Sequence, residues 1–222
     1  SAGEIAGLNV LQVITEPMAA AISYGLTVAG RKTIIVIDLG GGTFDVSVIS
    51  VDDGKVETIS IGGKNNLGGN DIDSKLMEYA LEKISKKLED LDTDLVCSLR
   101  LSCEKAKIQL SSEDACSIDW CGNSVTISRE ELQTICSPFL ESCKKIILGV
   151  LADAKKKAAD IDEILLVGLP TKMICFQTMV ESIFPHQELC KSISPDLAVS
   201  QGAAIQAAIK TGASEYKLKK IL

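Results

Sequence analysis

One stretch constrains the fold of this chain more than any other: residues 34–48, IIVIDLGGGTFDVSV. Two β-branched runs flank three consecutive glycines, Gly40, Gly41 and Gly42, and this pattern predicts a β-hairpin. Because the turn carries no side chains, its backbone N–H groups are able to reach an oxyanion directly. An ordinary hairpin with a permissive turn explains the same pattern, and the glycines alone do not separate the two interpretations.

Polar side chains stand on both sides of the glycine turn. Asp38 precedes it, and Thr43 and Asp45 follow it. The Thr43 hydroxyl adds a donor, but the two carboxylates repel a bare phosphate. Their presence therefore predicts a bridging cation, most simply hydrated Mg²⁺.

The bulk composition is that of a soluble globular protein. The chain has 222 residues, 46% of them hydrophobic and 24% charged, enough for one large or two small domains. A net charge of −7 argues against a surface for polyanions. We therefore expect no nucleic-acid partner, and, with no apolar stretch of spanning length, no membrane partner. The chain opens on Ser1 without a methionine, so we expect a piece of a longer protein.

The eight cysteines lack the spacing of a metal site or a disulfide framework. Five of them fall among apolar residues of expected helices: Cys97, Cys103, Cys136, Cys143 and Cys175. We expect these thiols to be small buried hydrophobic groups in a reducing, cytoplasmic compartment. Because His186 is the single histidine, the sequence excludes histidine triads and histidine metal clusters.

Apolar periodicity and turn residues predict the elements along the chain. Strands are expected at 8–14, 33–38, 44–51, 56–61 and 162–167, and a two-stranded piece at 115–127. Helices are expected from Pro17 to Gly25, from Asn70 with Asp73 as its cap, over 95–110, after 168, and from Ser194-Pro195-Asp196. A further helix starts at a capping box of Ser128 and Glu131, and Pro138 kinks or divides it. The mixture predicts an α/β fold with a mixed sheet and packed helices, with a subdomain border at Gly62-Gly63.

The helix over 95–110 carries a polar row of Arg100, Glu104 and Lys107. These residues follow an i, i+4, i+7 spacing, so they share one face. A solvated row of intrahelical salt bridges, each contributing a few tenths of a kcal/mol, explains the spacing for an isolated helix.

Five segments carry a resemblance to a known family. They are 5–26 (IAGLNVLQVITEPMAAAISYGL), 37–49 (IDLGGGTFDVSVI), 67–73 (LGGNDID), 102–112 (SCEKAKIQLSS) and 194–209 (SPDLAVSQGAAIQAAI). In this order and spacing they resemble the nucleotide-binding domain of the 70-kDa heat-shock chaperones, which belong to the actin-like ATPase superfamily. The resemblance implies the actin-like, ribonuclease-H-like fold and a divergent member of that family.

The resemblance also implies a domain organisation. The piece corresponds to the second lobe of a two-lobed domain, with an inner subdomain of residues 26–66 and 140–192 and an outer subdomain of 67–139. Segments 1–25 and 193–222 belong to or lead to the first lobe. Most of that first lobe and the peptide-binding domain are then expected elsewhere in a longer chain, with a J-domain co-chaperone and a nucleotide-exchange factor as partners.

Site roles follow from the resemblance position by position. ATP or ADP with Mg²⁺ is the implied ligand, and hydrolysis is implied to be attack of water on the γ-phosphate. Glu16 helps to place that water, and Asp38 and Asp45 serve the cation. The residues implied to contact nucleotide are Gly40, Gly41, Gly42, Thr43, Gly68, Gly69, Glu104, Lys107, Ser111, Gly168, Lys172 and Asp196.

The adenosine half of the implied site departs from the family pattern. Two arginines that grip the base are replaced by Ile108 and Lys172, and a glycine and a serine are replaced by Leu169 and Pro170. Losing guanidinium stacking costs about 0.5–2 kcal/mol per contact.

Two functions of different classes therefore stay open. The first is a chaperone ATPase whose nucleotide state controls client binding, with this piece by itself inactive in hydrolysis. The second is a degenerate, non-hydrolysing relative that acts as a scaffold or co-chaperone. A sugar kinase or filament protein of the same superfamily is disfavoured by the helix CEKAKIQLSS following LGGNDID.

Overall fold

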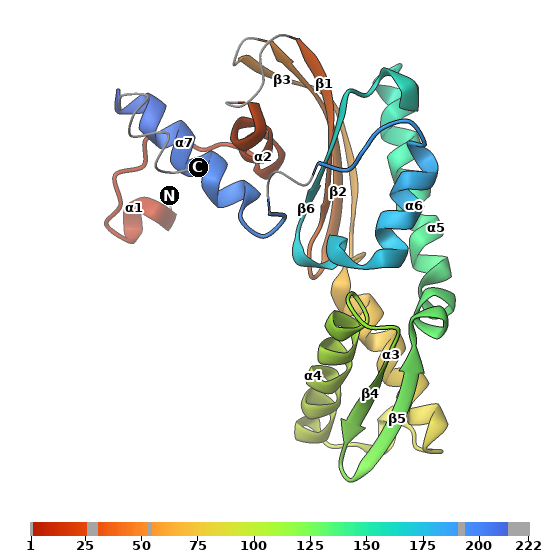
Figure 1. Cartoon of the computed structure of the whole chain (residues 1–222). Helices are drawn as coiled ribbons and strands as arrows, with labels where there is room; N and C mark the ends of the chain where they lie inside the picture. Colours follow the sequence, from red (N-terminus) through yellow and green to blue (C-terminus); the bar gives the residue numbers. More distant parts are fainter. Residues whose placement is uncertain (1, 26–30, 53–54, 191–193, 213–222) are drawn as a thin grey trace.

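The computed structural model of the chain describes residues 2–25, 31–52, 55–190 and 194–212 (Figure 1). The helices are α1 Ala2–Ile5, α2 Glu16–Gly25, α3 Gly69–Lys83, α4 Thr93–Gln109, α5 Arg129–Asp153, α6 Ile174–Ile183 and α7 Ala198–Lys210. The strands are β1 Lys32–Leu39, β2 Thr43–Asp52, β3 Lys55–Asn65, β4 Ala115–Trp120, β5 Asn123–Ser128 and β6 Glu163–Val167. Short 3₁₀ turns are η1 Leu88–Asp90, η2 Ala158–Asp160 and η3 Leu169–Lys172.

The larger sheet has four strands in the order β3-β2-β1-β6. Strands β1, β2 and β3 form an antiparallel meander, whereas β6 lies parallel to β1, so the sheet is mixed. The β1–β2 pairing places Asp38 opposite Asp45 beside the glycine turn. The parallel pairing places Val167 beside Asp38, so the loop after β6 starts next to the same turn.

Both faces of this sheet are covered because β1 is apolar at every position from Ile34 to Ile37. Ile34 and Val36 share a buried cluster with Ala20 of α2, whereas Ile35 and Ile37 share one with residues of α5 and α6. Figure 1 shows α2 and α7 on one side of the sheet and α5 and α6 on the other. Alternate side chains of a strand point to opposite faces, so a strand buried on both sides reads as one continuous apolar run.

A smaller unit lies at one end of the larger sheet. It consists of the β4–β5 hairpin with α3 and α4 (Figure 1). Ile118 and Trp120 of β4 share the buried core with Leu99 and Cys103 of α4. The residues between the two units belong to the end of β3 and the start of α3, which carry part of the site described below.

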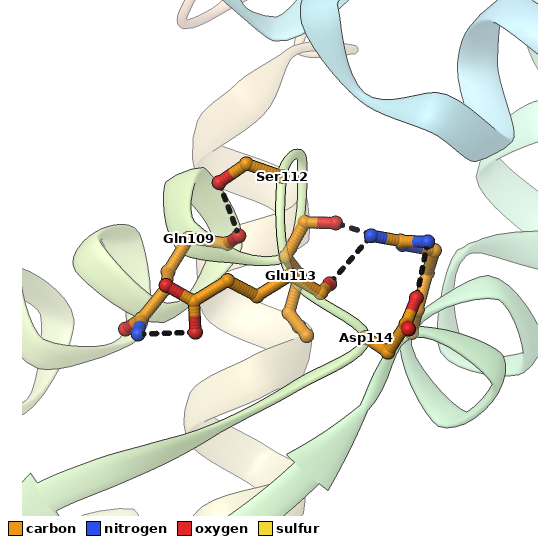
Figure 2. A network of polar contacts seen from close by, with 6 residues as sticks. Gln109, Ser112, Glu113 and Asp114 are labelled. Atoms are coloured by element: carbon orange, nitrogen blue, oxygen red, sulfur yellow. Dashed lines mark hydrogen bonds and ion pairs between the residues drawn. The ribbon is translucent and has the colours of Figure 1, made fainter.

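A polar network fixes the end of α4 in this smaller unit. Arg129 donates to the backbone oxygens of Leu110 and Glu113, at 3.1 and 2.7 Å, and to the Asp114 carboxylate at 2.6 Å. Figure 2 shows the neighbouring bonds of Gln109 with Glu113 and of Ser112 with the Gln109 carbonyl. The turn after α4, residues 110–112, is thereby tied to the start of α5.

Most expected elements are confirmed. The three-strand meander, the hairpin at 115–127, the strand before Gly168 and the helix from Pro17 are present. The capping box of α5 is present too, with Ser128 N donating to Glu131 Oε2 at 2.9 Å. The implied subdomain boundary at residue 26 lies outside the described residues.

Three local expectations, and one of the two alternatives for Pro138, were wrong. Residues 8–14 form no strand. Their side chains are half-exposed to exposed, and no strand of the described residues pairs with this segment. Pro138 does not divide α5, which is unbroken through Asp153. The last helix starts at Ala198, after a turn in which Ser194 O accepts from the N–H of Leu197. The α3 cap is Gly68, whose N–H donates to Asp71 Oδ2 at 2.8 Å, and neither Asn70 nor Asp73 caps the helix.

The cysteine expectation is confirmed for four of its five residues. Cys103, Cys136, Cys143 and Cys175 are buried, but Cys97 is exposed on α4. Burial raises the pKa of the Cys103 thiol to about 12, so this group stays protonated and unreactive at neutral pH. Within the described residues, no helix is long and apolar enough to cross a membrane.

Candidate nucleotide site

The glycine turn is held by its carbonyl groups. Gly40 O accepts from Gly69 N at 3.0 Å, Gly41 O from Asn70 N at 2.8 Å, and Gly42 O from Leu67 N at 3.2 Å. Among the described residues, none accepts a hydrogen bond from the N–H of Gly41 or Gly42. The turn is therefore anchored on one side and keeps two backbone donors for a ligand.

The glycines near the turn are of two kinds. A Cβ at Gly68 would lie 2.5 Å from Gly41 O, and a Cβ at Gly168 would lie 2.1 Å from Leu39 O, where φ is +87°. These two positions need glycine for packing. A Cβ at Gly42 meets nothing within 4 Å, and none of the turn glycines has a positive φ.

Neither packing nor backbone conformation therefore requires glycine at the three positions of the turn. Glycine in a structured segment costs about 0.5–1 kcal/mol relative to alanine through backbone entropy. A bare backbone in this place suits a ligand that approaches it closely, and phosphate oxygens are ligands of that kind. The turn therefore fits a phosphate group.

Asp38, beside the turn, lies close enough to Glu16 and Asp45 to be affected by their negative charges. Burial, then the charges of Glu16 and Asp45, raise the pKa of Asp38 to about 6. Glu16 opens α2 and Asp45 is exposed on β2. Mutual repulsion of this kind is relieved by a cation, and carboxylates are ligands that Mg²⁺ prefers.

The same acids do not form a chelating group for a bare ion. Among the described residues, no group of three or more histidine, cysteine, aspartate or glutamate side chains is arranged to hold a metal. Mg²⁺ usually keeps several of its waters and binds proteins through one or two carboxylates and substrate phosphates. The residues present fit a hydrated Mg²⁺ that is bound together with a phosphate, with Asp38 and Asp45 as the candidate contacts.

A cavity of about 260 Å³ opens next to the turn. Its walls come from the turn, the start of α3, one face of α4 and the segment around η3. The residues that line it are Gly40, Gly41, Gly69, Asn70, Glu104, Lys107, Ile108, Ser111, Leu169, Pro170 and Met173.

Lys107 is the buried centre of this cavity wall. Its ammonium lies 2.6 Å from Asp73 Oδ1 and donates to Gly69 O at 3.2 Å. Burial raises the pKa of Asp73, and the Lys107 ammonium partly offsets this effect. Lys107 thus binds α4 to the start of α3. It does not join the solvated row with Arg100 and Glu104 that explains the spacing for an isolated helix.

The cavity brings together six of the residues implied by the resemblance: Gly40, Gly41, Gly69, Glu104, Lys107 and Ser111. The others lie outside its lining: Glu16, Asp38, Gly42, Thr43, Asp45, Gly68, Gly168, Lys172 and Asp196. Six of these nine residues belong to the turn, its flanking strands or its contacts: Asp38, Gly42, Thr43, Asp45, Gly68 and Gly168.

Lys172 and Asp196 form a separate pair. The Lys172 ammonium lies 3.5 Å from Asp196 Oδ1, and both side chains are exposed. The hydroxyl of Ser194 also donates to Asp196, and this bond lowers the pKa of that carboxyl.

Three of the four positions that depart from the family pattern, Ile108, Leu169 and Pro170, form the apolar wall, whereas Lys172 does not line the cavity. Ile108 is 61% exposed and Leu169 is 59% exposed, so both present apolar surface at the cavity. Pro170 packs against the start of α3, where a Cβ at Gly69 would lie 2.9 Å from its ring.

Three residues of this region were not among the predicted site residues. Asn70 lines the cavity with its side chain beside Gly41, and Met173 contributes to the apolar wall. Asp73 is the buried partner of Lys107. A carboxylate at an inward position of α3, four residues after Gly69, was the available signal for Asp73, since buried acids are paired.

Comparisons with known proteins agree with this architecture. The family model described as "Hsp70 protein" matches residues 1–222. The chain is 38% identical over 234 residues to "Heat shock cognate 70 kDa protein 3" of Dictyostelium discoideum, covering 100% of this chain and 37% of that protein. It is 39% identical over 229 residues to "Chaperone protein DnaK" of Mycoplasmopsis agalactiae, covering 95% of this chain and 38% of that protein.

The chain therefore spans less than two fifths of the length of these two relatives. The expected family and fold class are both confirmed: a mixed sheet with packed helices, consistent with the actin-like ATPase domain of these proteins. The match over its whole length establishes that the chain belongs to the Hsp70 protein family.

Proposed function

We propose that this chain is part of the nucleotide-binding domain of an Hsp70-type chaperone and binds ATP or ADP with Mg²⁺. The observation that carries the proposal is the pair of free backbone donors at Gly41 and Gly42. They belong to a turn that borders a cavity of about 260 Å³ and that has acids behind it.

Different residues of the chain are proposed to bind different parts of the nucleotide. The Gly41 and Gly42 amides and the Thr43 hydroxyl receive phosphate oxygens, and Asp38 and Asp45 hold the hydrated cation. Glu104 of α4 and Ser111 of the turn after it face the sugar and base. When bound, ATP supplies a phosphoryl group that can be transferred to water, and Glu16 is the residue that helps to place this water.

In the longer protein, the nucleotide state is proposed to control client binding by a separate domain. The printed names of the two relatives, a heat shock cognate protein and a chaperone protein, support this role. A J-domain co-chaperone, a nucleotide-exchange factor and a cytoplasmic location are part of the same proposal. The inner and outer subdomains correspond in it to the larger sheet unit and the smaller unit.

Titration calorimetry with ADP and Mg²⁺ tests the binding role, with Gly42→Ala as the site variant and Gly149→Ala as its control. Both glycines have open space at the Cβ position and neither has a positive φ. We expect Gly42→Ala to weaken binding at least tenfold, about 1.4 kcal/mol, and Gly149→Ala to leave it unchanged. Equal affinities for all three proteins would contradict the proposal.

A second function is favoured by the exposed apolar wall of Ile108 and Leu169. In a non-hydrolysing scaffold or co-chaperone, the site would bind nucleotide weakly or not at all. Turnover by the full-length protein, abolished by Asp38→Asn, would remove this alternative. Full-length protein without turnover, but with an intact fold, would favour it.

A further inference from the structure

We propose that this cavity accepts purine nucleotides by the flat face of the base and discriminates little between adenine and guanine. The inference rests on the proposed nucleotide-binding function and names its substrate class as purine nucleoside phosphates in general. It comes from the chemistry of the cavity wall, which is apolar where a base is able to pack.

The lining has two chemical parts. Gly40, Gly41 and Asn70 supply backbone and amide groups at the glycine turn, where the phosphates are proposed to bind. Ile108, Leu169, Pro170 and Met173 supply aliphatic surface from α4 and the segment around η3. A planar apolar ring system packs on aliphatic surface of this kind through contact area, which adenine and guanine share.

The remaining polar groups of the lining do not select one purine edge. Asp73 and Gly69 O take two of the three N–H donors of the Lys107 ammonium. The third donor is able to meet N7, an acceptor that adenine and guanine share, so it does not separate the two bases. Ser111 has a hydroxyl, 3.5 Å from the Lys107 carbonyl, that is able both to donate and to accept. It suits the amino group of adenine and the carbonyl oxygen of guanine equally well.

Glu104 also fails to exclude guanine. Its exposed carboxylate only accepts hydrogen bonds, and guanine carries more edge donors than adenine. Strong discrimination, of about 10⁴-fold or more, arises when a wrong ligand leaves a buried polar group of the site unpaired. Neither Ser111 nor Glu104 is buried, so the wrong purine leaves neither of them without a partner, water included.

The test is competition of unlabelled nucleotides against a fluorescent ATP analogue on the chain, with Mg²⁺ present. We expect ATP, GTP and ITP to displace the analogue with affinities within about threefold of one another, and CTP to bind about tenfold more weakly because its base buries less apolar area. ATP binding more than about thirtyfold tighter than GTP, a difference that needs edge readout, would overturn the inference while leaving the proposed function standing. Failure of every nucleotide to bind would overturn the proposed function and this inference with it.

Two variants of α4 make the test specific. Ile108→Ala removes apolar surface at the cavity, and Leu101→Ala removes an equally exposed apolar side chain of the same helix, 57% against 61%, outside the lining. Ile108→Ala should weaken ATP and GTP by the same factor, about threefold to tenfold, and Leu101→Ala should change neither. If Ser111→Ala weakens ATP about tenfold or more and leaves GTP unchanged, adenine is read by its edge and the inference is wrong.

Discussion

The ammonium of Lys107 lies 2.6 Å from Asp73 Oδ1, and both side chains are less than a tenth exposed. This buried ion pair links α4 to α3, and its second contact, from Lys107 to Gly69 O, reaches the residue whose N–H binds Gly40 O. The wall that is proposed to face the base and the turn that is proposed to hold phosphate are therefore mechanically connected.

Breaking this pair from either side should destabilise the chain. Asp73→Asn leaves a buried ammonium without its counter-charge, and we expect a loss of about 3–5 kcal/mol in the free energy of unfolding. The double variant Asp73→Asn with Lys107→Met should recover much of this loss, because no buried charge is then left unpaired. Urea denaturation of the single and double variants measures both effects. Equal losses for the single and double variants would mean that the pair contributes nothing through its charges.

The single variants Asp73→Asn and Lys107→Met should also differ in how their stability responds to pH. In Lys107→Met, burial continues to raise the pKa of Asp73, and the ammonium no longer offsets it. Protonation of Asp73 on acidification then relieves part of the cost, so this variant should approach the wild type in stability as the pH falls. Asp73→Asn has no carboxyl to protonate and should show no such relief.

Asp38→Asn should stabilise the chain in the absence of Mg²⁺. The pKa of Asp38 is raised to about 6 in the folded chain, so the folded state binds more protons than the unfolded state between about pH 4 and 6. Stability contributed by this group is thus present below that window and is lost as the pH rises through it. At pH 7.5 we expect the variant to be about 1–2 kcal/mol more stable than the wild type, after discounting for partial exposure.

The same variant measured at pH 4 is its own control, because the difference should nearly vanish there. Added Mg²⁺ with ADP should stabilise the wild type at pH 7.5 and should stabilise Asp38→Asn far less. A variant that is less stable than the wild type at pH 7.5 would show that Asp38 is held by attractive contacts and is not a charge awaiting a cation.

Gly168 should be irreplaceable for reasons of packing. Its φ is +87°, and a Cβ would lie 2.1 Å from Leu39 O. Gly122, in the β4–β5 turn, has a similar φ of +77° but open space around it. Gly122→Ala should cost about 1 kcal/mol from backbone strain alone, and Gly168→Ala should cost several times more or prevent folding. Similar losses of stability in both variants would contradict the close approach of β1 to the loop after β6.

The chain alone should not hydrolyse ATP at a rate above that of its Asp38→Asn variant. It spans less than two fifths of the length of the relatives to which it was compared, and the first lobe is proposed to supply the rest of the catalytic cleft. Phosphate release measured with malachite green, at saturating ATP and Mg²⁺, tests this. Turnover well above the variant would show that these residues suffice for the chemistry.

Sequence patterns whose local propensity and burial pattern agree predicted their structures well. The apolar run of β1, the glycine turn and the capping box of α5 each combine local propensity with a burial pattern that points the same way. Residues 8–14 alternate like a strand, but alternation does not reveal whether a neighbouring strand is available. The structure gives them none, so the pattern failed there.

The candidate site was predicted less completely than the fold. The glycines and the α4 positions were identified by motif, since backbone amides and a polar row leave a local signal. The pairing of Lys107 with Asp73 was not, because it joins residues on two helices and depends on how those helices pack. The contribution of Met173 has the same cause, since a methionine carries no sign of which cavity it lines.

The most direct test of the central claim is an amide NMR titration of the chain with ADP and Mg²⁺. We expect the N–H resonances of Gly41 and Gly42 to shift strongly, because these free donors receive the phosphates. The resonance of Gly122, in the remote β4–β5 turn, should stay in place. Saturating ADP that moves other amides and leaves those of Gly41 and Gly42 unchanged would contradict the account.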